Sequence, residues 1–369
     1  MFRGGQVNDY SYISIISSEH EGNILLSNGE DTVEVPEIGG KIIEKIQYLN
    51  ETNQVDKEIY KEYGVKVSSE EFIKDLDSFG FLIDKNQTIN DTACFLGEIL
   101  NKIIFSRCSY LCYLIFLSVC IYLLYVKGAH YFFGYSYMFS DSKNTISILV
   151  YLLLSWVSVF FHELMHYLTS AGFKVFSKIS LGTRLQFLVA QTTIYNPYKL
   201  KPSERIKIYI SGMLGDYIIC AFCMIIIAST NCSLILYISR CVLYIKISAI
   251  VWQCLFYMKT DIYFIFTTIT KEYNLMNDAQ DYKLKDSTES SIIIKWYRCF
   301  LTMGRIVTLL YFLVFEFPLI YLLVLKIFNN GVNFDGICSS LLLLSTWIIF
   351  IFVLFKTKIA PFLRKKGGS

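Results

Sequence analysis

From about Phe105 onward the chain carries long runs of apolar residues without charges, and these runs constrain its fold more than any other feature. With 54% hydrophobic and only 18% charged residues, the chain is too apolar for an ordinary soluble protein. The first hundred residues differ, because they have a normal charge density and hold most of the acidic side chains. The sequence therefore predicts a small soluble head followed by a polytopic α-helical membrane domain.

Six segments reach the roughly 20 apolar residues that a helix needs to cross about 30 Å of hydrocarbon. They are residues 108–125, 146–168, 208–228, 234–257, 304–325 and 337–355. Lysine and arginine are concentrated in the loops after the second and fourth segments and are scarce in the other loops, as expected when the basic loops are cytoplasmic. We therefore expect a multi-pass protein in contact with the lipid bilayer, with both termini in the cytoplasm.

Charge and cysteine usage exclude two kinds of site. The net charge of +3 is small and dispersed, so we expect no nucleic-acid partner. Most of the 11 cysteines lie in apolar runs and are interpreted as small buried hydrophobes. Cys220 and Cys223 have a zinc-like spacing, but they stand alone on an apolar helix, so a metal role is not expected.

Residues 1–90 are expected to form the head, a small α+β domain of winged-helix-like type. Two strand-like stretches, 10–16 and 23–27, precede three segments with helical periodicity. The third segment begins with a capping box of Ser68 and Glu71, ends at Gly80 and is followed by a short extended piece. Residues 91–107 are expected to be a linker to the membrane domain at 108–366, and 367–369 an added linker.

The second membrane segment contains the sequence His162-Glu163-Leu164-Met165-His166. Two histidines four residues apart project from one face of a helix, which is the spacing that grips one zinc ion. Zinc lowers the pKa of bound water to about 7, and a carboxylate such as Glu163 can accept its proton. The segment predicts a hydrolytic zinc site near the cytoplasmic end of the helix. A purely structural set of hydrogen-bonded polar residues is the other interpretation.

Two histidines leave a catalytic zinc ion one protein ligand short. Asp261 follows the fourth segment at its predicted cytoplasmic end, level with His166, and is the best candidate. Asp216 in the third segment is a competitor, and Glu316 in the fifth is a more remote one. Taken alone, Asp261 can also be interpreted as an ordinary interfacial charge beside Lys259.

Residues 146–275 resemble the site-2 protease family of intramembrane zinc metallopeptidases. That family has HExxH on a membrane helix, a glycine-containing helix downstream, and an aspartate ligand in an Asn-x-x-Pro-x-x-x-x-Asp-Gly pattern. The last pattern falls here at Gln253, Phe256, Asp261 and Ile262, so the aspartate is kept, the amide is a glutamine, and the proline and glycine are replaced. The downstream glycine motif is matched by Ser211-Gly212-Met213-Leu214-Gly215-Asp216.

The resemblance implies one Zn²⁺ per chain and a role for each of seven residues. Zinc ligands are His162, His166 and Asp261, the catalytic base is Glu163, and substrate contacts are Gln253, Asp216 and Gly212. For Asp216, pairing with another polar residue inside the helix bundle is an equal alternative. Arg240, Lys246 and Glu316 are further charges in the membrane segments, expected to pair with Asp216 or with one another.

The stretch from 174 to 205 is too polar in parts to span a membrane and too apolar for a free loop. A re-entrant or edge hairpin and a folded interfacial loop are both compatible with it. In site-2 proteases the corresponding region resembles a membrane-embedded strand that pairs with an extended substrate. This mode of binding would suit a protease, which must hold unfolded backbone.

The head resembles the PqqD-like domains that hold leader peptides in the maturation of ribosomally made peptides. The resemblance rests on the pattern EIGGKIIEKI, VDKEIYKEYGV and SSEEFIKDLDSFGFLI, and a generic winged-helix fold is the alternative. Together the two resemblances imply a metallopeptidase of the bacterial plasma membrane that cleaves a bacteriocin-like precursor peptide. The precursor, bound through the head, is the expected partner, and an export transporter or modifying enzyme of the same pathway is a further candidate. Regulated proteolysis of a membrane-anchored signalling protein and a non-enzymatic transporter or immunity protein are the alternatives.

Overall fold

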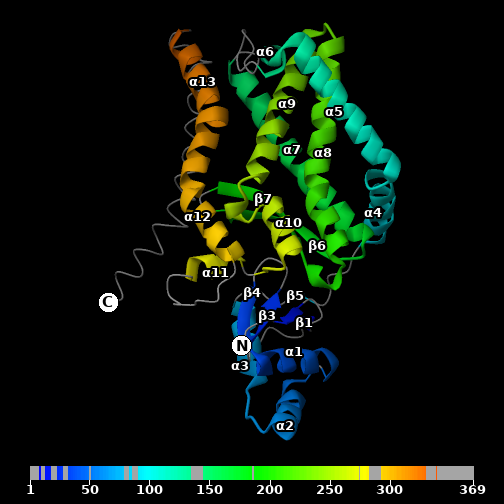
Figure 1. The fold of residues 1–369 in the computed structure, drawn as a ribbon, viewed down its shortest axis with the longest axis vertical. Coiled ribbons are helices and arrows are strands. Elements are labelled where there is room, and N and C mark those ends of the chain that lie inside the picture. The colour runs from blue at the N-terminus through cyan, green and yellow to red at the C-terminus, as the bar shows by residue number, and fades with distance from the viewer. Residues whose placement is uncertain are drawn as a thin grey trace. The chain divides into compact units, whose positions relative to one another are not determined.

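The structure is a computed structural model of the whole chain, and a defined subset of its residues is described. These are residues 8–9, 13–17, 23–27, 32–49, 51–78, 83–84, 90–133, 144–184, 187–273, 275–281, 292–329 and 338. Packing divides the chain into two compact units, one of 1–101, 167–178 and 192–205, and one of 102–166, 179–191 and the chain from 206 onward. Figure 1 labels the helices and strands.

The head combines two small sheets with three helices. Strands β2 (Ser14–Ser17), β3 (Asn23–Ser27) and β4 (Thr32–Pro36) form an antiparallel sheet in that order. In its register Leu26 of β3 lies opposite Ile15 of β2 and Val33 of β4. Strand β1 (Asn8–Asp9) pairs with β5 (Ile83–Asp84). Strand β4 was not predicted from the sequence, although its valines alternate with an exposed Glu34 as a half-buried strand requires.

Helices α1 (Glu37–Leu49), α2 (Thr52–Tyr63) and α3 (Ser69–Ser78) match the three predicted helical segments. They bury a shared apolar cluster of Ile42, Ile46, Val55, Ile59 and Ile73. At the start of α3 one hydrogen bond of the predicted capping box is present, because the backbone N–H of Glu71 donates to Ser68 Oγ at 3.4 Å. The described part of the head therefore contains both strands and helices, as predicted, while the predicted stop at Gly80 lies outside the described residues.

The segment 91–107, expected to be a linker, instead contains helix α4 (Asp91–Ile104). Asn90 caps this helix, since its side-chain oxygen accepts from the backbone N–H of Thr92 at 2.9 Å. On one side of α4, Gly97 lies so close to Gly172 that a Cβ on Gly97 would be 2.5 Å from the Gly172 nitrogen. This close contact leaves no room for a side chain at Gly97, and the role of 91–107 as a linker between two domains stays a prediction.

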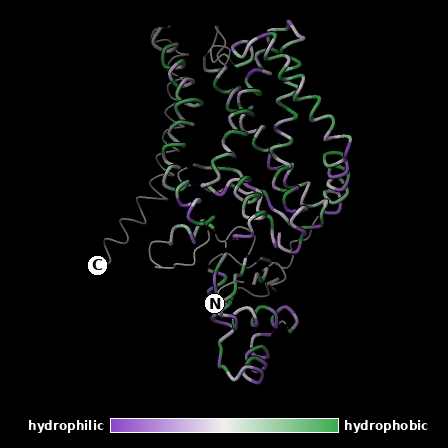
Figure 2. The backbone as a smooth tube through the Cα atoms, viewed as in Figure 1, coloured by the Kyte–Doolittle hydropathy of each residue, from purple (hydrophilic) through white to green (hydrophobic). Residues whose placement is uncertain are grey.

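Four described helices are long and apolar enough to cross a membrane. They are α5 (Arg107–Lys127), α7 (Asn144–Gly172), α8 (Pro202–Ser229) and α9 (Ser233–Gln253). Helices α5, α7 and α8 each cover a predicted segment, and α7 and α8 extend several residues beyond it, whereas α9 covers only the first part of its segment. Figure 2 shows hydrophobic residues along these helices and a mixed pattern on the helices of the head. A core of Cys120, Phe132, Met224 and Leu243 joins α5, α8 and α9 to the short helix α6 (Ala129–Phe133).

The fourth and fifth predicted segments differ from the helices that form. Helix α9 ends at Gln253 instead of continuing to 257, and a short 3-10 turn η4 (Phe256–Met258) leads to helix α10 (Asp261–Thr270). Residues 304–325 lie within α12 (Ile292–Tyr311), the π-helical η5 (Phe312–Glu316) and α13 (Phe317–Asn329), after a short helix α11 (Leu275–Asp281). The predicted helix at 337–355 lies outside the described residues, Cys338 excepted.

The region from 174 to 205 forms a hairpin. Strands β6 (Ser177–Arg184) and β7 (Phe187–Ile194) pair with each other, and a short η3 turn (Pro197–Lys199) leads to α8. Lys174 and Asn196 adopt positive φ angles of 59° and 56° on either side of the hairpin. A hairpin is therefore present, and whether it is re-entrant, at a sheet edge or part of an interfacial loop stays open.

Candidate metal centre

The two histidines of the HExxH segment lie one turn apart in the second half of α7. Their ring centroids are 4.8 Å apart and their Nε2 atoms 3.1 Å apart. Both side chains are buried, with His162 6% and His166 4% exposed. The preceding residues of α7 are uncharged and mostly apolar, so two buried imidazoles on this helix need polar partners.

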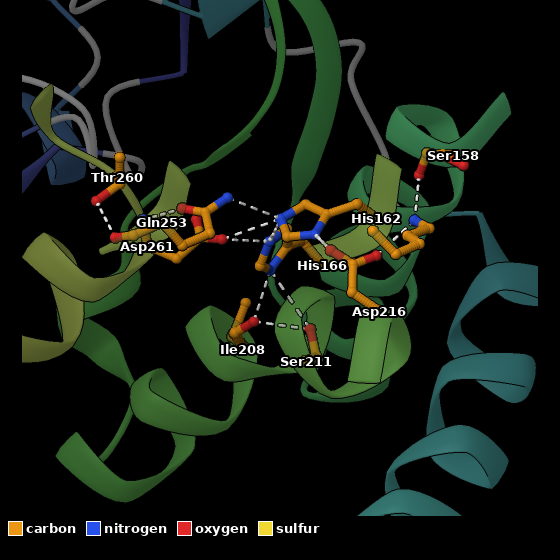
Figure 3. Close-up of polar contacts among 10 residues, drawn as sticks. Ser158, His162, His166, Ile208, Ser211, Asp216, Gln253, Thr260 and Asp261 are labelled. Carbon is orange, nitrogen blue, oxygen red and sulfur yellow. Dashed lines mark hydrogen bonds and ion pairs between the residues drawn. The ribbon is translucent and has the colours of Figure 1, made fainter. Parts of the chain in front are cut away.

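Asp261, the first residue of α10, brings a carboxylate to these two nitrogens. Its Oδ2 atom lies 3.0 Å from His162 Nε2 and 3.1 Å from His166 Nε2. Figure 3 shows the two imidazoles facing this carboxylate. In the part of the chain that the structure describes, no other group of three His, Cys, Asp or Glu side chains converges in this way.

The turn before Asp261 is held by Gln253 and Thr260. The side-chain oxygen of Gln253 accepts from the backbone N–H of Asp261 at 3.0 Å, and Thr260 Oγ1 donates to the Gln253 carbonyl at 2.8 Å. Lys259 takes a left-handed conformation with φ 55°, which glycine adopts more readily. Side-chain hydrogen bonds thus define this turn, although the chain lacks the proline and glycine of the pattern that it resembles.

The outer nitrogens of both imidazoles are hydrogen-bonded on the side away from Asp261. His166 Nδ1 lies 2.7 Å from the Ile208 carbonyl, which can only accept, so Nδ1 carries the proton. His162 Nδ1 lies 2.7 Å from Asp216 Oδ2, and a carboxylate there also favours a protonated Nδ1. Both Nε2 lone pairs are thereby directed at the space beside Asp261, which is the tautomer that a metal ligand requires.

Helix α8 passes this space at Gly212. A Cβ added to Gly212 would lie 2.5 Å from His166 Nε2 and 2.7 Å from His162 Nε2. Such distances are far below van der Waals contact, so any side chain at this position would occupy the space between the nitrogens. One turn along, the atoms nearest to a Cβ on Gly215 belong to the flexible side chain of Met165, the first of them at 3.0 Å. Gly212 is therefore the position that keeps the centre open.

The three donor atoms fit a zinc ion. In a tetrahedral site with bonds of about 2.0–2.1 Å, neighbouring ligand atoms are about 3.3 Å apart. The three separations here, 3.0, 3.1 and 3.1 Å, come close to that value and are almost equal. Two imidazoles and one carboxylate leave the fourth position for water or substrate, as in catalytic zinc sites. His162, His166 and Asp261 would therefore hold the ion.

The remaining predicted residues take different positions around the three proposed ligands or lie outside the described side chains. Glu163 is buried, 8% exposed, and follows His162 directly on α7. Asp216 contacts the far side of His162, so it does not compete with Asp261 as the third ligand. Gln253 contacts two of the three proposed ligands. Its side-chain oxygen accepts from the backbone N–H of Asp261, and its side-chain nitrogen is 3.3 Å from His162 Nε2. The side chain of Glu316 lies outside the described residues. Substrate contacts by Gln253, Asp216 and Gly212 stay predictions.

A buried ion pair stands behind the centre. Lys246 Nζ donates to Asp216 Oδ1 and, at 2.6 Å, to the Ser158 carbonyl. This pairing of Lys246 with Asp216 was predicted from the two charges in apolar segments, and it is confirmed. The roles of the Ile208 and Ser158 carbonyls were missed, because a backbone acceptor leaves no residue-type signal in a sequence.

Comparisons with protein-family models, with curated proteins and with solved structures returned no match.

Proposed function

We propose that this protein is an intramembrane zinc metallopeptidase of the site-2 protease type. The observation that carries the proposal is the triangle of His162 Nε2, His166 Nε2 and Asp261 Oδ2, with edges of 3.0–3.1 Å. It is supported by Glu163, a carboxylate beside the first histidine, in the arrangement that metallopeptidases use. A set of structural polar residues would not need three donor atoms converging with their lone pairs on one point.

Each residue then has a defined task in peptide-bond hydrolysis. A bound zinc ion supplies a polarised water and a Lewis acid for the substrate carbonyl. Glu163 takes the proton of the attacking water while the water oxygen bonds to the carbonyl carbon. Glu163 then passes that proton to the leaving nitrogen as the C–N bond breaks. The Ile208 carbonyl and the Asp216 carboxylate keep the two imidazoles in the required tautomer.

The substrate class is proposed from the head and the hairpin. In the described part of the head, β2 and β4 are the outer strands of the three-stranded sheet, and an outer strand can bind an extended peptide by main-chain hydrogen bonds. The pair β6 and β7 offers a second sheet edge of the same kind. We propose that the head holds the leader of a ribosomally made precursor peptide and that the membrane domain cleaves this peptide at the cytoplasmic side of a bacterial plasma membrane.

Replacement of Glu163 tests the chemistry. Glu163→Gln keeps the size of the side chain and all three proposed ligands, so the purified variant should retain one zinc ion per chain and lose cleavage by at least about 100-fold. His162→Ala should lose the zinc as well. His130→Ala is the matched control, because it removes an exposed imidazole outside the centre and should change neither property. Normal cleavage by Glu163→Gln would contradict the mechanism, and a wild-type protein without metal would favour a transporter or immunity protein.

Deletion of the head tests the substrate. Without residues 1–90 the membrane domain should keep its zinc and lose binding of the precursor peptide, measured by fluorescence anisotropy of a labelled leader. Unchanged leader affinity would reject the recognition role. Efficient cleavage of a transmembrane helix that bears no leader would instead assign the enzyme to regulated proteolysis.

A further inference from the structure

The proposed chemistry uses Asp216 only as the acceptor behind His162, and it gives no role to Lys246, the buried partner of Asp216. Asp216 is 1% exposed and Lys246 is 1% exposed, so both charges are withdrawn from solvent. A charged residue near the centre of a membrane helix costs about 2.5–3.5 kcal/mol. Replacing such a pair by apolar residues of similar volume is often neutral or stabilising, so stability alone does not explain why the chain has it.

The contacts of the pair connect three helices at one histidine. Asp216, on α8, accepts from Lys246 with Oδ1 and lies 2.7 Å from His162 Nδ1 with Oδ2. Lys246, on α9, also donates to the carbonyl of Ser158, 6% exposed, which precedes His162 by one turn of α7. The backbone before His162 and the ring of His162 are therefore held by the same two side chains.

We infer that Lys246 and Asp216 are positioning residues for the metal centre, acting through His162. This inference rests on the proposed zinc site. Asp216 fixes the plane and the tautomer of the imidazole, and Lys246 fixes Asp216 by offsetting its charge and orienting its second oxygen. Carboxylates behind a metal-binding histidine increase its basicity, and their loss typically weakens metal binding by about 10–100-fold. The Nδ1 atom of His166 is hydrogen-bonded to the Ile208 carbonyl. One histidine is therefore oriented by a carboxylate and the other by a backbone carbonyl.

The geometry also explains why the partner of Asp216 is a lysine on a third helix. His162 is hydrogen-bonded to one carboxylate oxygen of Asp216. The other oxygen is buried inside the helix bundle, where it pairs with Lys246 in place of water. A single ammonium group with three donors can serve this oxygen and the Ser158 carbonyl together. An apolar residue at 246 would leave a buried carboxylate with one neutral partner, which is costly.

The test compares two double variants that both remove the charges. Asp216→Leu with Lys246→Met removes the acceptor behind His162, whereas Asp216→Asn with Lys246→Met keeps a side-chain oxygen there. Neither variant leaves a lone buried charge, so both are expected to remain folded. Tyr244→Phe is the matched control, because it removes a buried hydrogen bond from the same helix, between the Tyr244 hydroxyl and the Phe315 carbonyl, away from the centre.

Zinc affinity is measured on the purified full-length proteins by competition with a chromophoric chelator, and the ligand geometry from the visible spectrum of the Co²⁺ form. We expect Asp216→Leu/Lys246→Met to bind Zn²⁺ about 10–100-fold more weakly with an altered Co²⁺ spectrum. Asp216→Asn/Lys246→Met should recover most of the affinity, and Tyr244→Phe should match the wild type. Wild-type affinity in the leucine variant, or equal losses in both double variants, would overturn the inference. Absence of metal binding by the wild type would instead reject the zinc site itself.

Discussion

The head and the membrane domain distribute polar and apolar residues in opposite ways. In the head, Leu26, Ile43 and Ile59 are fully buried, and ion pairs such as Lys41 with Glu44 lie on the surface. In the membrane domain, Leu114 is 62% and Phe160 is 53% exposed, while His162, Asp216 and Lys246 are buried. An exposed leucine is ordinary next to lipid, and an exposed ion pair is ordinary next to water.

Buried polar groups in the membrane domain therefore indicate a functional site, whereas surface ion pairs in the head do not. Surface ion pairs in water contribute little, so those of the head indicate only a solvated face. Buried polar groups in apolar helices are costly, and here His162, His166, Asp216, Lys246 and Asp261 all belong to one connected set. Substitutions in the two regions should therefore act on different properties, metal binding in one and folding free energy in the other.

The largest effect is expected at Gly212. Its Cβ would lie within 2.7 Å of both metal-facing nitrogens, so Gly212→Ala should displace the imidazoles and reduce bound zinc from one ion per chain to nearly none. Gly215→Ala is the control, since its Cβ meets a flexible methionine side chain at 3.0 Å. Metal analysis of both purified proteins measures the outcome. Full zinc occupancy in Gly212→Ala would show that the ion does not lie between the two histidines.

A comparable change in the head should leave zinc untouched. Ile46 is 1% exposed in the core of α1, α2 and α3, and Ile46→Ala should lower the local unfolding free energy by about 2–5 kcal/mol. Tyr48→Ala on the same helix, where the side chain is 85% exposed, should change it by less than about 0.5 kcal/mol. Hydrogen exchange of the full-length protein, read separately in the head and the membrane domain, checks both. Loss of zinc from Ile46→Ala would break the separation of the two regions.

Gln253 tests how the turn before Asp261 serves the centre. Gln253→Leu removes the acceptor of the Asp261 N–H and should weaken zinc binding by about 10–100-fold. Thr260→Val removes a different hydrogen bond of the same turn, to the Gln253 carbonyl, and should weaken binding less. Chelator competition ranks the two variants. A larger loss for Thr260→Val would place the support of Asp261 in the backbone of the turn instead of the Gln253 side chain.

Features with a local sequence pattern could be predicted from the sequence, whereas contacts between distant residues could not. Long apolar runs predicted the membrane helices, and the spacing of His162 and His166 predicted a shared face. Pairing across 95 residues, as between His166 and Asp261, leaves no local pattern. The expected depth in the membrane and the resemblance around Asp261 were the two indications of it. The end of α9 at Gln253 was missed because the run of apolar residues continues beyond it, while the break depends on side-chain contacts made by Thr260 and Asp261.

The smallest effect is expected at the surface pair of Lys45 with Glu62 in the head, whose charged atoms are 2.8 Å apart. A hydrogen bond from Lys45 lowers the pKa of Glu62 below its ordinary 4.5, and hydrogen bonds to Glu62 and then Glu58 raise the pKa of Lys45 above 10.5. A lowered carboxyl pKa stabilises the folded head above about pH 4.5, and this contribution is lost as the pH falls through the folded value.

The raised lysine pKa adds a contribution that is present below about pH 10.5 and is lost as the pH rises through the folded value. Between these limits Glu62→Gln should therefore destabilise the head slightly, and the variant and the wild type should converge as the pH falls through the lowered pKa of Glu62. Hydrogen exchange in the head across this pH range is the measurement, with 0.5 M salt as a second condition that should reduce the difference. If the difference in stability between Glu62→Gln and the wild type persisted in acid and in salt, Glu62 would contribute by packing. The charged residues of the head would then be more than a solvated surface.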